Sequence, residues 1–197
     1  LYAANGSKVI ITDINDGDGL LEADKIQSKG NEAFYFHLDV TSASDWFHLV
    51  SKVIKEYGRI DILVNNAGVY PRGTLDTTEI EDWDRVFRVN SKGVFVGTKA
   101  VLPQMKKQGN GSIVSISSIA GIIGSKQSVA YNSAKGAIRL FTKSVAIQYA
   151  AQGIRANTIH PGPMATQMLD ELFITKEESE ERRKGVPLGR FDTVVAN

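Results

Sequence analysis

A serine, a tyrosine and a lysine are spaced so that they could act together on one oxygen atom. Tyr131 and Lys135 stand four residues apart in the segment YNSAK, on a predicted helix, and residues i and i+4 share a helix face. An ammonium held there favours the phenolate and lowers the tyrosine pKa from its free value of about 10. A tyrosine that titrates nearer neutrality can act as a general acid or base on a carbonyl or alcohol oxygen. Ser118 ends the strand SIVSISS and can hydrogen-bond the same oxygen, which distinguishes this set from an ordinary surface pair.

Two further segments could hold a nucleotide-like ligand. Asn65 to Gly68 (NNAG) follow the strand IDILV, and ligands of open parallel sheets bind at the carboxyl ends of strands. Ala67 and Gly68 have little or no side chain, so a flat ligand can approach the backbone. Asp13 ends the strand KVIIT, where a carboxylate could bond adenosine ribose hydroxyls and repel a 2′-phosphate. From these residues alone, an ordinary turn at NNAG and a turn or capping role for Asp13 stay open.

The elements that must position these residues alternate along the whole chain. Near-continuous apolar strands separated by helices predict a parallel sheet covered by helices on both faces. The predicted strands are 8–12, 33–38, 60–64, 112–116 and 154–159, and the predicted helices are 16–29, 43–57, 79–107 and 128–151. No linker or repeat interrupts this order, so residues 1–197 form one predicted domain. Residues 163–190 break the pattern, and we expect them to form a lid whose charged run at 176–184 is a solvated helix face.

Composition removes several classes of function. Lys and Arg number 23 and Asp and Glu 22, so the net charge of +1 gives no reason to expect a nucleic-acid or membrane partner. The absence of cysteine excludes disulfides, thiolate catalysis and cysteine metal sites, and it fits a cytoplasmic location. No apolar run approaches the roughly 18 residues of a membrane span. His37, His48 and His160 show no ligand spacing, so we expect no metal site.

Taken in order, these motifs resemble the short-chain dehydrogenase/reductase family. The resemblance rests on NNAG, on the spacing of Ser118, Tyr131 and Lys135, and on Pro161 and Gly162 after a strand, and it runs through nearly the whole chain. It implies a Rossmann-type, doubly wound α/β fold and a nicotinamide-dependent oxidoreductase acting on CH–OH groups. It also implies a homodimer or homotetramer. Stretches such as FHLDVT and IRLFTKS look somewhat like cyclic-alcohol dehydrogenases.

The resemblance implies a role for each site residue. Tyr131 would exchange the substrate proton, Ser118 would position the substrate oxygen, and Lys135 would lower the tyrosine pKa and bond the nicotinamide ribose. Asn90, in RVNSKG, would hold a water that relays protons from Lys135 to solvent. The implied cofactor contacts are Asp13, Asp39, Val40, Asn65, Ala67, Gly68, Tyr131, Lys135, Pro161, Gly162 and Thr166. We expect NAD rather than NADP because of Asp13, and because no arginine lies immediately around Asp13 to accommodate a phosphate.

One departure from the family concerns the sheet itself. The glycine-rich TGxxxGxG segment, the strand before it and the family's last strand have no counterpart here, and Leu1–Asn5 reads as the end of a helix. The family's first strand lies between the strands that end at Asp13 and Val64. Its absence predicts a sheet split in two with unpaired edges, and we expect the intact protein to be longer.

Three functions are compatible with the sequence. The first is NAD-dependent oxidation of a small, largely apolar secondary alcohol, possibly alicyclic. The residues expected around the substrate are mostly apolar: Val69, Tyr70, Ile119, Ile122, Ile123, Met164, Met168, Leu169 and Phe173. The second is a 3-oxoacyl-carrier-protein reductase, although VYPRG follows NNAG where TRD is usual. The third is a truncated, non-catalytic paralogue that acts as a binding partner, against which the complete catalytic set argues.

Overall fold

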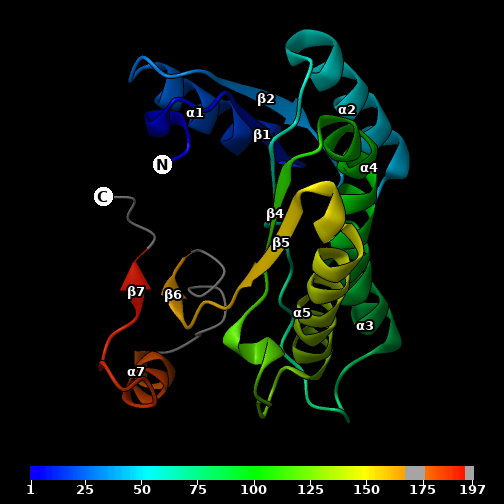
Figure 1. The fold of residues 1–197 in the computed structure, drawn as a ribbon. Coiled ribbons are helices and arrows are strands. Elements are labelled where there is room, and N and C mark those ends of the chain that lie inside the picture. The colour runs from blue at the N-terminus through cyan, green and yellow to red at the C-terminus, as the bar shows by residue number, and fades with distance from the viewer. Residues whose placement is uncertain (167–175, 194–197) are drawn as a thin grey trace.

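Strands and helices alternate along the chain as predicted (Figure 1). The computed structural model describes residues 1–166 and 176–193. The helices are α1 (Asp16–Gln27), α2 (Ala43–Tyr57), α3 (Ile80–Val86), α4 (Gly93–Gln108), α5 (Val129–Tyr149) and α7 (Lys176–Lys184). The strands are β1 (Val9–Asp13), β2 (Ala33–His37), β3 (Ile62–Asn65), β4 (Gly111–Ile116), β5 (Ile154–Ile159), β6 (Met164–Ala165) and β7 (Asp192–Thr193).

The central strands are parallel but form two separate sheets. β1 pairs with β2, with Val9 opposite Ala33, and β4 pairs with both β3 and β5, with Gly111 opposite Ile154. Among the described residues no ladder joins β1 to β3. The parallel pairing confirms the predicted α/β fold, and the division into two sheets is the one expected without a strand between β1 and β3.

Helices cover the two sheets unequally. α1 packs against β1 and β2, whereas α4 and α5 pack against the three-stranded sheet and α2 packs on α4. Figure 1 shows α2, α4 and α5 together on one side of the strands. In β3, Leu63 points to that side and is buried, but Ile62 and Val64 are 42% and 39% exposed. Within residues 1–166 and 176–193, the helices that pack on this sheet share one face, whereas α1 packs on β1 and β2.

One apolar core joins both sheets through the helices. Its buried members are Leu38, Trp46, Leu49, Leu63, Val96, Val101, Met105, Ile113, Val145 and Ile154. Trp46 of α2, one of these members, donates an indole hydrogen bond to the Val40 carbonyl at 3.1 Å. A Cβ atom at Gly97 would lie 2.6 Å from the Trp46 ring, so glycine is what allows α4 to approach α2 this closely.

The predicted helix 79–107 contains a π-helical turn. α3 ends at Val86, a π-helical segment spans Phe87–Lys92, and α4 continues from Gly93. A π turn inserts an extra residue into the helical repeat and often occurs at functional sites. Asn90 lies in this turn and is fully buried.

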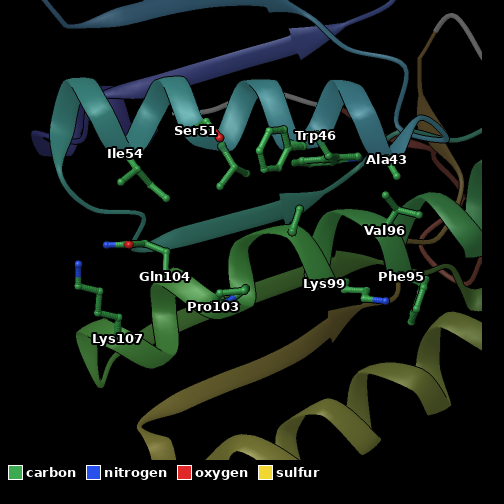
Figure 2. A pocket seen from close by; sticks show the side chains of 13 residues that line it. Ala43, Trp46, Ser51, Ile54, Phe95, Val96, Lys99, Pro103, Gln104 and Lys107 are labelled. Carbon is green, nitrogen blue, oxygen red and sulfur yellow. The ribbon is translucent and has the colours of Figure 1, made fainter.

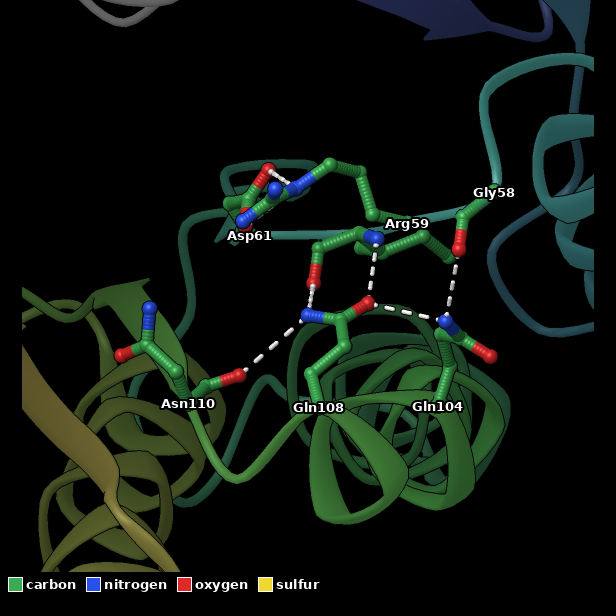
Figure 3. A network of polar contacts seen from close by, with 7 residues as sticks. Gly58, Arg59, Asp61, Gln104, Gln108 and Asn110 are labelled. Carbon is green, nitrogen blue, oxygen red and sulfur yellow. Dashed lines mark hydrogen bonds and ion pairs between the residues drawn. The ribbon is translucent and has the colours of Figure 1, made fainter.

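Two glutamines at the end of α4 hold the segment that leads into β3 (Figure 3). Gln108 accepts a hydrogen bond from the Ile60 backbone N–H and donates one to the Ile60 carbonyl, both at 2.8 Å. Gln104 donates to the Gly58 carbonyl at 3.0 Å and to the Gln108 side-chain oxygen at 2.9 Å. These side chains thus pair with backbone groups that precede the strand.

We expect Gln108→Ala to lower the free energy of unfolding by about 2 kcal/mol, because it leaves two partly buried backbone groups of Ile60 without these partners. Denaturant unfolding measures the change. Lys107→Ala, at the exposed neighbouring position, is the matched control and should have little effect. Equal stability of the two variants would show that the pairing contributes nothing.

Candidate active site

The structure brings Ser118, Tyr131 and Lys135 together where β4 ends beside α5. Tyr131 and Lys135 share one face of α5, with the lysine Nζ 5.5 Å from the centroid of the tyrosine ring. Lys135 Nζ donates to the Ile116 carbonyl at 2.7 Å, and the Ser117 hydroxyl donates to the Lys135 carbonyl at 2.9 Å. These bonds tie the helix to the strand end that carries Ser118.

Burial dominates the electrostatics of this group. Loss of solvent raises the pKa of Tyr131, a hydrogen bond with Ser118 lowers it, and the neighbouring Tyr70 raises it. Burial also lowers the pKa of Lys135 to about 8. The Tyr131 pKa is thus raised, opposite to the lowering predicted from Lys135, because burial outweighs the hydrogen bond with Ser118 and the lysine Nζ bonds the Ile116 carbonyl.

Asn90 reaches this group from the π-helical turn. Its side chain accepts a hydrogen bond from the Val69 N–H at 2.8 Å and donates one to the Val69 carbonyl at 2.9 Å. A Cβ atom at Gly68 would lie 3.3 Å from Asn90 Oδ1 and 3.7 Å from Lys135 Nζ. The asparagine therefore holds the turn after NNAG directly beside the lysine.

Tyr70 is the neighbour whose role the sequence did not reveal. Its ring centroid lies 4.2 Å from that of Tyr131, and its hydroxyl hydrogen-bonds the hydroxyl of Ser128, immediately before α5. The sequence placed Tyr70 only among residues around the substrate. The signal available was its position after NNAG, which does not predict a contact with a residue 61 positions later.

The predicted cofactor residues follow the carboxyl ends of parallel strands and therefore lie along one edge. Asp13 ends β1 and is exposed, with Oδ1 accepting from the Asn15 N–H at 2.9 Å. Asp39 and Val40 follow β2, and Asp39 Oδ1 accepts from the Thr41 N–H at 2.8 Å.

NNAG follows β3 at the same edge. Ala67 is exposed and Gly68 partly so. The Asn65 side chain, by contrast, is buried and donates to Thr98 at 3.2 Å and Ser115 at 3.4 Å. Its amide holds β3 against α4 and β4, so a cofactor contact from this residue would fall to its backbone.

A second carboxylate accompanies Asp13. Asp16, in the first turn of α1, accepts hydrogen bonds from the Tyr35 hydroxyl at 2.6 Å and pairs with the His37 ring at 2.8 Å. These two hydrogen bonds, with the tyrosine the stronger cause, lower the Asp16 pKa. The same hydroxyl lies 2.8 Å from the Asp13 carbonyl oxygen, so its single proton is shared between the two acceptors. The end of β1 thus has two carboxylates beside it, Asp13 and Asp16, whereas the sequence pointed only to Asp13.

The segment after β5 lies against the Ser118 turn. Pro161 accepts from the Ile119 N–H at 3.0 Å, Gly162 is exposed, and the Thr166 hydroxyl donates to the Met164 carbonyl at 3.4 Å. β6 pairs with β7 beyond it. Of the predicted lid, Met168, Leu169, Leu172 and Phe173 lie outside the described residues.

A groove of about 610 Å³ lies elsewhere, between α2 and α4. Figure 2 shows Trp46 and Ile54 of α2 directed toward α4, with Phe95 and Lys99 among the residues on the other wall. Its lining includes none of the predicted catalytic or cofactor residues. The groove is therefore separate from the candidate active site.

Residues 1–166 and 176–193 contain neither a membrane-spanning helix nor a metal-binding cluster. None of the helices there combines the length and apolar character needed to cross a lipid bilayer. The same part of the chain holds no cluster of three or more His, Asp or Glu side chains that could ligate a metal ion.

The chain is similar in sequence and in structure to known proteins. A family model described as short chain dehydrogenase matches residues 1–177. Cyclopentanol dehydrogenase of Comamonas testosteroni is 38% identical over 190 residues, which cover 96% of this chain and 76% of that protein. Trans-4-hydroxycyclohexanecarboxylate dehydrogenase of Sinomonas cyclohexanicum is 38% identical over 174 residues, covering 85% and 67%. A gluconate 5-dehydrogenase from Burkholderia cenocepacia, solved with NADP and tartrate, superposes with a TM-score of 0.91 at 32% identity, covering 98% and 75%.

Proposed function

Because this chain belongs to the short-chain dehydrogenase family and is an oxidoreductase acting on CH–OH groups, we propose that it oxidises a small, largely apolar secondary alcohol with NAD. The observation that carries the proposal is the surface beside Ser118. Ile119, Ile122 and Ile123 follow it directly and are 38%, 53% and 57% exposed. Exposed apolar side chains next to a proton-transfer group favour an apolar ligand with few polar anchors.

The proposed mechanism assigns one task to each residue. Tyr131, in its phenolate form, takes the proton of the alcohol. Ser118 hydrogen-bonds the alcohol oxygen and holds it in position for this transfer. Lys135 supplies a positive charge that favours the phenolate when its amine is protonated. Asn90 fixes the turn after NNAG through its two hydrogen bonds with the Val69 backbone. It would also hold the water that relays protons from Lys135 to solvent. A bound nicotinamide would supply the hydride acceptor, and the protein supplies orientation and electrostatics.

The residues at the edge fit such a cofactor. The NNAG turn is exposed at Ala67 and carries no Cβ at Gly68, next to the Lys135 amine, so a flat group can approach the backbone there. Asp13, Asp39 and Val40 would hold the adenosine part, and Pro161, Gly162 and Thr166 the nicotinamide part. Tyr131 and Lys135 would contact the nicotinamide ribose.

We expect catalytic efficiency with NAD to exceed that with NADP. Asp13 and the ionised Asp16 place negative charge at the end of β1, which would repel a 2′-phosphate. Asp13→Asn should narrow the preference by about tenfold, the effect of removing about 1.4 kcal/mol of repulsion. The matched control is Asp24→Asn, at an exposed position farther along α1, which should leave the preference unchanged. A parent enzyme that prefers NADP, the cofactor seen with the gluconate 5-dehydrogenase, contradicts the assignment.

The exposed isoleucines after Ser118 and the names of two relatives favour one class of substrate. Two of them carry the names of enzymes acting on cyclopentanol and on a hydroxycyclohexane carboxylate. A cyclic secondary alcohol places its reacting carbon in a compact apolar ring, which suits the isoleucines after Ser118. We therefore propose an alicyclic alcohol or ketone as substrate.

A panel of cyclic and linear secondary alcohols with NAD, set beside acetoacetyl thioesters with NADH and NADPH, tests this substrate class. We expect higher kcat/KM on cyclic than on linear alcohols. Activity confined to the thioesters would instead show a 3-oxoacyl-carrier-protein reductase, and no turnover of any of these compounds would favour a non-catalytic binding partner. A homodimer or homotetramer and a cytoplasmic location stay predictions, the latter resting on the absence of cysteine.

A further inference from the structure

The ring of His160 lies between the end of β5 and the turn that carries Ser118. Its Nδ1 is 3.1 Å from the Ser118 carbonyl oxygen, and its Nε2 is 2.9 Å from the Thr158 hydroxyl. The sequence predicts neither a metal site nor any other task for this histidine. The structure places both ring nitrogens within hydrogen-bond distance of protein oxygens.

His160 occupies the position where the ladder between β4 and β5 loses a donor. Beyond the strand ends the Ser117 N–H still donates to the Ile159 carbonyl at 2.8 Å, and the Ile119 N–H donates to the Pro161 carbonyl at 3.0 Å. Proline has no N–H, so it cannot donate back toward β4. The ring of the preceding residue supplies a donor from the same strand end.

The chemistry of the two contacts fixes the tautomer of the neutral ring. A carbonyl oxygen only accepts hydrogen bonds, so the proton must be on Nδ1. The Nε2 atom then accepts from the Thr158 hydroxyl, and every polar atom of the imidazole has a partner. The second partner of the Ser118 carbonyl is the Gly121 N–H, at 2.9 Å, which lies within the same turn.

We propose that His160 is a positioning residue that acts through Ser118. The Ser118 hydroxyl accepts from the Ala120 N–H at 3.1 Å, and its carbonyl accepts from Gly121, so both of these contacts are internal to the turn. The imidazole anchors this turn from outside, to the β5 segment that leads into Pro161 and Gly162. It thereby fixes where the serine hydroxyl meets the substrate oxygen, and it links that point to the segment proposed to hold the nicotinamide.

The test compares His160→Asn with His160→Gln, using His160→Ala as the full deletion. The asparagine amide nitrogen stands as many bonds from Cβ as Nδ1, so it can still donate to the Ser118 carbonyl, whereas the glutamine amide stands at the position of Nε2. We expect H160N to keep kcat within about threefold, and H160Q and H160A to lose about 10–100-fold in kcat, since small misplacements of a positioning group have effects of this size. The loss should fall more on kcat than on KM for NAD, because the imidazole bonds the Ser118 turn directly. Equal kcat for H160N and H160Q would overturn the proposal.

A second measurement does not need activity. Long-range proton–nitrogen NMR correlations of the resting protein, assigned by the signal that disappears in H160Q, report which ring nitrogen carries the proton. We expect the Nδ1–H form, and an Nε2–H form would overturn the proposal. The inference rests on the proposed function, but the two fail differently: a parent protein that oxidises no secondary alcohol refutes the function, while the tautomer decides the contact with Ser118.

Discussion

Tyr131→Phe is expected to reduce turnover by about 10²–10⁴-fold, the range typical of a lost general acid or base. The variant removes one hydroxyl oxygen and keeps the ring that packs 4.2 Å from Tyr70, so the fold and the cofactor contacts should persist. Turnover is measured as NADH formation, and NADH binding by fluorescence titration. We expect the Kd for NADH to stay near that of the parent protein.

Tyr149→Phe provides the matched control for this variant. It makes the same chemical change at the far end of α5, where the tyrosine ring packs on the core and contacts Lys106. Its turnover should match that of the parent protein. Near-normal turnover of Tyr131→Phe would remove Tyr131 from proton transfer, and loss of NADH binding in that variant would show instead that the hydroxyl holds the cofactor.

Asn90→Ala is expected to lower the free energy of unfolding by about 3 kcal/mol and also to abolish most turnover. The Asn90 side chain is fully buried and pairs with both polar groups of the Val69 backbone. Its removal leaves a partly buried N–H and a partly buried carbonyl of Val69 without these partners, at about 1–3 kcal/mol each. Turnover falls because the turn after NNAG loses its support beside Lys135.

Chemical denaturation and steady-state rates measure the two effects of Asn90→Ala separately. Asn157→Ala, at an exposed position on β5, makes the same change without burial and should alter neither quantity. An Asn90 variant of parental stability would mean that the Val69 pairing is not what keeps the turn in place. Parental turnover in a destabilised variant would confine Asn90 to a structural role.

The sequence predicted the order of elements closely because its signals are local. Gly58 ends α2 with a φ of 74°, and the apolar period of the preceding residues places that helix at Ala43–Tyr57, as predicted. Residues that follow strand ends were also placed correctly along one edge, since parallel strands carry their carboxyl ends to the same side. The family motifs therefore located Ser118, Tyr131 and Lys135 as a group.

Burial and contacts between residues distant in sequence set other properties, which local sequence patterns do not predict. The spacing of Tyr131 and Lys135 predicts their proximity but not the loss of solvent that raises one pKa and lowers the other. The inward turn of Asn65 depends on Thr98 and Ser115, which no local pattern connects to it. His160 meets Ser118 from 42 residues away.

The buried amine of Lys135 links folding to proton release. Its pKa is about 8 in the folded protein, against about 10.4 for an exposed lysine in the unfolded chain. Between these values the unfolded chain binds more protons than the folded one, so this residue makes the free energy of unfolding rise with pH across that window and opposes folding most strongly below it. An amine kept at the active site in this way weakens the protein near neutral pH, and a ligand that bonds the ammonium would recover part of that stability.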